Sequence, residues 1–162
     1  MSAILVWLQR FESLVAAMAY AGVAGLLLGE IVAREIFSSS IWGSQRIAVF
    51  CAIVAGFLGL SLATGSNGHL RPQFADNWFP AKMRDGVARF GDFLSAVTWI
   101  VFAVIAAAYV TETYESNEKA AVLYWLLWPL QLVLPYAFAS CGTRHFIFGL
   151  KPELKPEPML ME

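Results

Sequence analysis

The sequence has little charge, and what it has is unevenly placed. Charged residues make up 14% of the 162 residues and hydrophobic residues 59%, whereas a soluble domain carries about 25% charged residues. Four stretches contain no Asp, Glu, Lys or Arg, namely 13–29, 47–70, 93–111 and 120–143. Roughly 20 helical residues cross a hydrocarbon core of about 30 Å. The pattern predicts an all-α integral membrane protein with four helices and disfavours a soluble helical bundle.

Cysteine, histidine and basic runs are also scarce. The two cysteines, Cys51 and Cys141, fall in opposite membrane halves of the predicted topology, so no disulfide is expected. They form no metal-ligand spacing, and no basic run indicates nucleic-acid binding. The sequence contains no nucleophile–base spacing, phosphate loop or paired carboxylates. We therefore expect no catalytic site, no metal and no cofactor, and we predict that the chain is not an enzyme.

Three regions are predicted along the chain. A cleaved signal peptide is disfavoured because Arg10 and Glu12 precede a first apolar run that is too long and that ends in charges. The third span follows a short surface helix over 81–92. The expected regions are an amphipathic lead-in at 1–12, a membrane domain at 13–150 with spans at about 13–36, 47–68, 92–112 and 120–143, and an extended cytoplasmic tail at 151–162.

The basic residues indicate the orientation of the chain. With the amino terminus inside, eight Lys and Arg residues face the cytoplasm and three face outward: Arg34, Arg46 and Lys119. Short cytoplasmic loops carry an excess of Lys and Arg, so we expect both termini to be cytoplasmic. This topology places Arg144 and His145 at a helix exit on the inner side. Pro129 and Pro135 predict a kinked fourth helix.

Small residues recur along one face of each of the first two spans. Helices in lipid associate by close approach across such residues. We expect at least one face to hold the four helices together. The candidate helix-packing residues are Ala21, Gly25 and Gly29 in the first span and Ala52, Gly56 and Gly59 in the second.

No ionisable group falls in the middle of a predicted span, although such groups usually mark transport or proton pathways. Glu30 comes nearest, and Arg34 follows it at i+4, the spacing of a local ion pair. A proton-coupling glutamate, as in small four-helix multidrug exporters, is an alternative. It is disfavoured because the acidic residue of those proteins lies near mid-membrane.

Two histidines, His69 and His145, fall at the predicted cytoplasmic ends of spans. Histidines from two helices could ligate a haem. A haem- or quinone-binding membrane anchor of a respiratory oxidoreductase is therefore the main alternative from another class. The loop-like context of His69, between Gly68 and Arg71, disfavours it.

Several residues recur in an order that resembles a known family. They are Arg34 and Phe37 near the end of the first span, Ile41-Trp42 after a polar turn, Gly59 in the second span, Gly68-His69-Leu70-Arg71 at its exit, and Pro135 in the fourth span. From about Gly22 to Leu150 the chain resembles the small permease subunit of tripartite ATP-independent periplasmic (TRAP) transporters, the DctQ-like family. It differs at Gly43-Ser44-Gln45 and at Pro72-Gln73, where the family often has acidic residues.

The resemblance implies a division of labour in a bacterial inner membrane. A large permease subunit would move a small organic acid with sodium, and a periplasmic substrate-binding protein would deliver it. The small subunit would brace the permease and contribute to docking. The implied partner or lipid contacts are Glu30, Arg34, Trp42, Gln45, His69 and Arg71. The small subunit of a tripartite tricarboxylate transporter, which also has four spans, is a further alternative.

Overall fold

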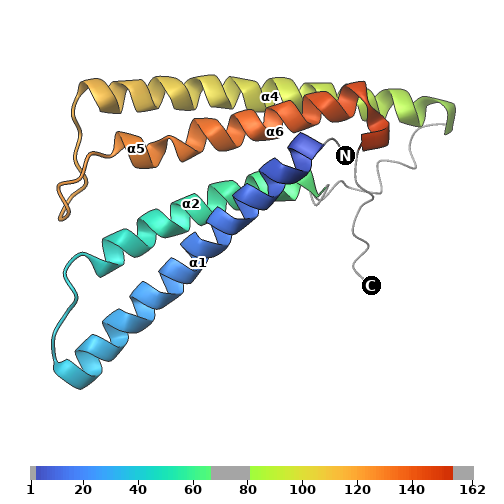
Figure 1. Ribbon diagram of the computed structural model, residues 1–162. Helices are drawn as coiled ribbons and strands as arrows, with labels where there is room; N and C mark the ends of the chain where they lie inside the picture. Colours follow the sequence, from blue (N-terminus) through green and yellow to red (C-terminus); the bar gives the residue numbers. More distant parts are fainter. Residues whose placement is uncertain (1–2, 67–80, 155–162) are drawn as a thin grey trace.

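The chain folds into long antiparallel helices arranged as two hairpins (Figure 1). A computed structural model describes residues 3–66 and 81–154. The first hairpin pairs α1 (Ala3–Phe37) with α2 (Ser44–Gly65). In the second, α4 (Ala81–Glu115) pairs with α6 (Val133–Leu150), which the short helix α5 (Trp128–Gln131) precedes. A single 3₁₀ turn, Pro152–Leu154, follows α6.

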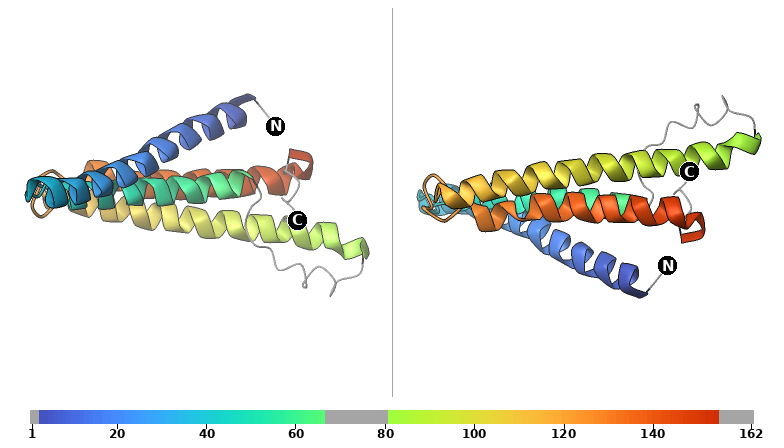
Figure 2. Two further views of the ribbon diagram at one scale, coloured as in Figure 1. Left: turned by 90° about the horizontal axis from the view of Figure 1, so that it is seen from below. Right: turned by 90° about the horizontal axis from the view of Figure 1, so that it is seen from above.

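The two hairpins form a V. They lie close together at the end where α1 begins and α6 ends, which we call the terminal end (Figure 1). The helices diverge toward the opposite end, where α1 turns into α2 and α4 leads to α5, which we call the loop end. The two loops meet there again, since Leu123 lies against Gly43. Contacts between α2 and α6 join the two arms. Edge-on views show the first turns of α1 standing away from the other helices (Figure 2).

Three helices within the described residues are long and apolar enough to cross a membrane. They cover Val6–Phe37, Ser44–Gly65 and Gly86–Glu115. Helix α6 has 18 residues, which corresponds to about 27 Å, and it contains Arg144 and His145. The all-α architecture with membrane-length helices is confirmed. That α5 and α6 form a fourth membrane span stays a prediction. The side of the membrane that the termini face also stays a prediction.

Two helices are longer than the spans predicted within them. Helix α1 runs without a break through the predicted lead-in, and α4 joins the predicted surface helix at 81–92 to the third span. Each has 35 residues, or about 52 Å. Charges mark where a helix leaves lipid, but the backbone hydrogen bonds continue until a proline or a cap ends them. Neither helix contains a proline.

The helix of the fourth predicted span begins at Trp128, later than the start of the apolar run at 120. The residues before Trp128 form a turn in which the Ala120 amide donates to the Trp125 carbonyl at 2.7 Å. Pro129 lies in the first turn of α5, where its missing amide costs nothing. A break at Leu132 separates α5 from α6, as expected for a kinked segment. The helix then continues to Leu150.

The predicted small-residue faces lie on the outside of the chain. A Cβ added at Gly25, Gly56 or Gly59 would meet no atom within 4 Å, and one at Gly29 would meet only Ile41, at 3.8 Å. Ala21 and Ala52 are exposed. The packing partner of these faces therefore stays a prediction.

Other glycines provide the close approaches inside the chain. A Cβ at Gly142 of α6 would lie 2.8 Å from Ile100 Cδ1 of α4. One at Gly22 of α1 would lie 3.4 Å from Cys51 Sγ of α2. A repeat of small residues identifies a face of a helix, but it does not say which neighbour the face meets.

Candidate functional site

A buried ion pair joins the first and last helices at the terminal end. Arg144 Nη2 of α6 donates to Glu12 Oε2 of α1 at 2.5 Å. Both side chains are at most 3% exposed. The same guanidinium donates through Nη1 to the Ser61 carbonyl of α2 at 3.1 Å. The pair therefore connects three helices at one point.

Hydroxyl groups complete the environment of the Glu12 carboxylate. Its Oε1 lies 2.9 Å from the Ser140 hydroxyl, and it lies 3.0 Å from the hydroxyls of Tyr136 and Ser61. A buried charge is tolerated only when it is paired and hydrogen-bonded. The carboxylate meets both conditions, and its oxygens are engaged by four side chains of this chain. The arrangement is that of a structural clamp.

Gly65 makes room for the guanidinium. A Cβ at this last residue of α2 would collide with Arg144 Nη1. Thr64, 1% exposed, donates to Cys141 Sγ at 3.3 Å beside it. Small residues at the end of α2 thus allow α6 to bring a large cation against the α2 backbone.

The buried pair corrects the expectation for Arg144. The residue was expected at a helix exit because it ends the fourth charge-free run. It lies inside α6 and is 3% exposed, because the compensating carboxylate comes from the other end of the sequence. Glu12 likewise lies inside α1 rather than in a lead-in before it. One signal in the sequence could have indicated this pair. Glu12 and Arg144 each border a charge-free run, and the predicted topology puts both at the cytoplasmic side.

A second carboxylate organises the loop end. Glu30 Oε1 accepts from Arg34 Nε at 3.1 Å and from the Ser40 hydroxyl at 2.7 Å. Its Oε2 accepts from the Ile41 amide at 2.9 Å and from the Ser44 hydroxyl at 2.8 Å. The predicted Glu30–Arg34 pair is confirmed. Glu30 also fastens the loop between α1 and α2 onto the helix that precedes it.

The fastened loop presents Trp42 at the surface. Gly43, with φ +77°, adopts the left-handed conformation that glycine tolerates best, and a Cβ there would lie 2.6 Å from Leu123 Cδ2 of the second hairpin's loop. Trp42 is 68% exposed and Gln45 is exposed as well. Arg34 keeps 57% of its side chain exposed. The structure thus brings Glu30 and Arg34 together and leaves Trp42 and Gln45 on the outside.

Of the two candidate histidines, the structure describes His145, which lies on α6 near the terminal end. His145 Nδ1 is 3.5 Å from Asp92 Oδ1 of α4, and both side chains are largely buried. His69 and Arg71 lie outside the described residues. Within those residues, no group of three His, Cys, Asp or Glu side chains could hold a metal ion.

The all-helical fold, with three helices in the described residues that are long and apolar enough to span a bilayer, is that of an integral membrane protein. A family model described as "Tripartite ATP-independent periplasmic transporters, DctQ component" matches residues 23–147. The match covers most of the chain, and the chain belongs to this family of TRAP transporter components. The membership agrees with the predicted family and favours it over a respiratory anchor or a tricarboxylate transporter subunit.

A curated relative supports the assignment. The chain is 25% identical over 96 residues to a sialic acid TRAP transporter permease protein, SiaT, of Haemophilus influenzae (strain 86-028NP). The matched region covers 59% of this chain and 16% of the relative. The chain therefore corresponds to a small part of that permease protein.

Proposed function

We propose that this chain is the small membrane subunit of a TRAP-type secondary transporter in a bacterial inner membrane. It braces the large permease subunit and takes part in docking a periplasmic substrate-binding protein. The transported solute is a small organic acid, and its uptake is driven by sodium. The observation that carries the proposal is the family match over residues 23–147.

The use of the buried charges supports a bracing role. Charged groups inside membranes usually serve transport when they face a water-filled path or a substrate. Here the carboxylates of Glu12 and Glu30 are each engaged by side chains or backbone of the same chain. They stabilise the positions of the helices. We assign the charged groups that take part in transport to the permease subunit.

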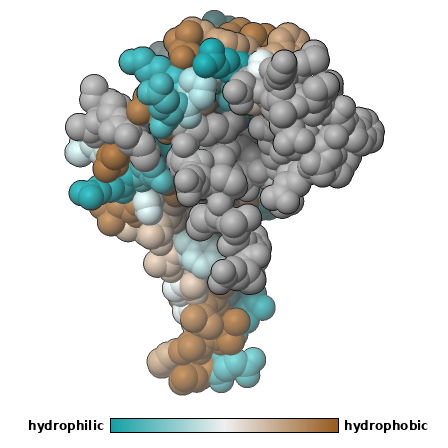
Figure 3. Space-filling model, turned by 90° about the vertical axis from the view of Figure 1, so that its right-hand side faces the viewer, coloured by the Kyte–Doolittle hydropathy of each residue, from teal (hydrophilic) through white to brown (hydrophobic). Residues whose placement is uncertain are grey.

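The outward face of α1 supports a large protein partner. Leu14, Met18, Leu28 and Ile31 are each more than half exposed, and the exposed Gly25 lies on the same helix. Small residues between large apolar ones allow a neighbouring helix to approach closely. The hairpin of α1 and α2 also projects from the molecule as a narrow, mostly hydrophobic stalk (Figure 3). We assign this stalk to contact with the permease.

The relative points to the same association. In it, the region similar to this chain forms 16% of a protein named a permease. A unit that can be part of a permease polypeptide is expected to lie against the permease when the two are separate chains. We place the docking contact at the loop end, where Glu30 holds Trp42 in an exposed position.

Reconstitution tests the proposal directly. The tagged chain, extracted from its native membrane in mild detergent, should bring with it a larger multi-span protein. In sealed vesicles the chain alone should move no solute. Permease, small subunit and binding protein together should take up an organic acid only with an inward sodium gradient. Extraction of homo-oligomers alone, or transport by the isolated chain, would overturn the assignment.

A further inference from the structure

The loop between α4 and α5 is apolar, whereas the loop between α1 and α2 is polar. Residues 119–127 contain one charge, Lys119, and no Gly, Pro, Ser, Asn or Asp, the residues that dominate turns. The loop at 38–43 contains three serines and a glycine among its six residues. Both loops lie at the loop end (Figure 1). The two hairpins therefore end in loops of opposite character.

Two residues of the apolar loop adopt a backbone conformation that costs free energy. Val122 has φ +78° and Tyr124 has φ +57°. In this left-handed region the Cβ atom crowds a carbonyl oxygen, and a β-branched residue there is an outlier. Glycine or asparagine would adopt the same turn at a lower cost. The large side chains at these positions therefore do not serve the turn itself.

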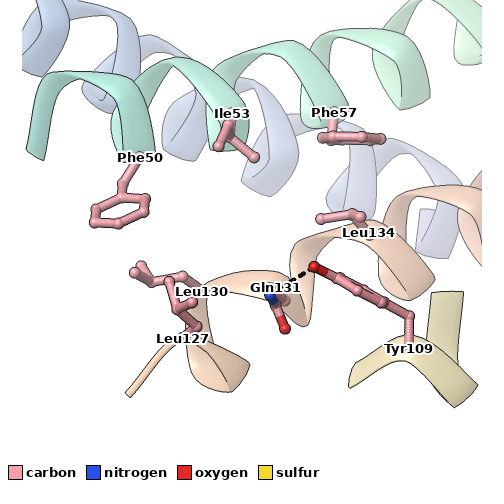
Figure 4. Close-up of a pocket in the computed structure, with 8 residues that line it drawn as sticks. All are labelled: Phe50, Ile53, Phe57, Tyr109, Leu127, Leu130, Gln131 and Leu134. Carbon is pink, nitrogen blue, oxygen red and sulfur yellow. Dashed lines mark hydrogen bonds between the residues drawn. The ribbon is translucent and has the colours of Figure 1, made fainter. Parts of the chain in front are cut away.

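Two leucines hold the apolar loop against the rest of the chain. Leu123 is 4% exposed and lies against Gly43 of the polar loop. Leu127 lines the pocket between α5 and α2, opposite Phe50 (Figure 4). The large side chains around these anchors are exposed instead, and they are Val122, Tyr124, Trp125 and Leu126. The loop is thus fixed in place and presents an apolar and aromatic surface.

Backbone amides of the apolar loop are paired inside the loop. The Ala120 amide donates to the Trp125 carbonyl at 2.7 Å, and the Tyr124 amide donates to the Ala120 carbonyl at 2.9 Å. The Leu127 amide donates to the Glu118 carbonyl at 3.0 Å. Backbone groups that leave water must find such partners within the protein. The loop therefore has a backbone suited to a lipid environment.

We propose that the loop at 119–127 inserts into the bilayer interface and anchors the loop end to the membrane. Tryptophan and tyrosine gather at this depth, because the ring lies against acyl chains while its polar atom reaches water. Helix α4 is membrane-length as far as Glu115, so the loop begins where the helix reaches the headgroups. Lys119 is exposed at the start of the loop, where its ammonium reaches lipid phosphates. The polar loop at 38–43 stays in water.

Spin labelling tests the depth of the loop in the complex reconstituted in lipid vesicles. A nitroxide at Tyr124→Cys should be relaxed several-fold more by oxygen, which partitions into lipid, than by a water-soluble nickel complex present on both sides of the membrane. The matched control is Ser39→Cys in the polar loop, which is also exposed and should show the opposite ratio. Labelling of the unsubstituted chain gives the background from Cys51 and Cys141.

Two outcomes of this experiment would overturn the proposal. Ready access of the nickel complex to the label at Tyr124→Cys would place the loop in water. Access of neither relaxing agent would show that a protein partner covers the loop. Because the readout is the depth of the label, it does not depend on transport or on the identity of the permease.

A second variant tests the argument from backbone strain. Val122→Gly keeps the turn, because glycine tolerates its φ, and removes an apolar side chain from the interface. The variant should be at least as stable in detergent as the parent chain, and it should shift the label at Tyr124→Cys toward the nickel complex. A less stable Val122→Gly chain would assign Val122 to packing within the protein and would contradict its role in insertion.

Discussion

The buried carboxylates of Glu12 and Glu30 differ in the distance over which they act. Glu30 contacts residues within 14 positions of itself, and it fixes the shape of one loop. Glu12 contacts residues up to 132 positions away, and it joins α1, α2 and α6. The loop end is therefore organised locally, while the terminal end depends on the completed chain. The two ends should respond differently when their charges are removed.

Removing Arg144 should have the largest effect. Arg144→Met leaves the Glu12 carboxylate buried without its cation, and breaking a buried pair in this way costs about 3–5 kcal/mol. The free energy of unfolding, measured by titrating detergent-solubilised protein with SDS, should fall by this order.

The matched double variant separates the charge from the packing. In Glu12→Gln with Arg144→Met, the amide still accepts from the hydroxyls of Ser61 and Ser140, so most of the lost stability should return. A double variant that is as unstable as Arg144→Met would show that the pair is not the source of the effect.

A methyl group at Gly65 should have the second largest effect. In Gly65→Ala the new Cβ collides with Arg144 Nη1, so the guanidinium must leave the Ser61 carbonyl or Glu12. We expect the unfolding free energy to fall by about 1–3 kcal/mol, the usual cost of an unpaired buried polar group.

Gly59→Ala is the control for this substitution. It lies on the same helix, where a Cβ meets nothing within 4 Å, and alanine favours helix by up to about 1 kcal/mol. It should be neutral or stabilising. Equal losses in Gly59→Ala and Gly65→Ala would remove the role assigned to the Arg144 contact.

Glu30→Gln should loosen the loop end without unfolding the chain. The neutral amide holds the Ile41 amide and the two serine hydroxyls less strongly, because hydrogen bonds to a charged acceptor are the stronger ones. Hydrogen exchange at the Ile41 amide should become several-fold faster, while α6 stays protected. Glu35→Gln, an exposed carboxylate on the same helix, should leave exchange unchanged. Unaltered exchange in both variants would contradict the fastening role.

Arg34→Gln should have the smallest effect on stability. Arg34 supplies one of four contacts to Glu30, and 57% of its side chain is exposed. The unfolding free energy should stay close to wild type, because Ser40, Ser44 and the Ile41 amide still donate to Glu30 and an exposed cation contributes little to an ion pair. A reduced yield of the permease in co-purification would nevertheless mark Arg34 as a partner contact. A wild-type yield would limit the residue to its local pair with Glu30.

Features that depend on residues close together in the sequence could be predicted from it. Hydrocarbon-length runs locate α1, α2 and α4, and the i+4 spacing locates the Glu30–Arg34 pair. Hydropathy could not locate the start of the fourth arm, because the apolar residues 120–127 form a turn with positive φ at Val122 and Tyr124. It also could not show that Glu12 and Arg144 meet. That contact depends on how α1 and α6 are placed around α2, and no local pattern encodes this placement.

The separation of Glu12 and Arg144 along the chain has a consequence for biogenesis. At a synthesis rate of about 5–20 residues per second, Arg144 emerges roughly 7–26 s after Glu12. During that interval the early carboxylate has no cation to accompany it into lipid. The first turns of α1 should therefore remain at the water boundary until α6 is synthesised, and Arg144 then completes the insertion of Glu12.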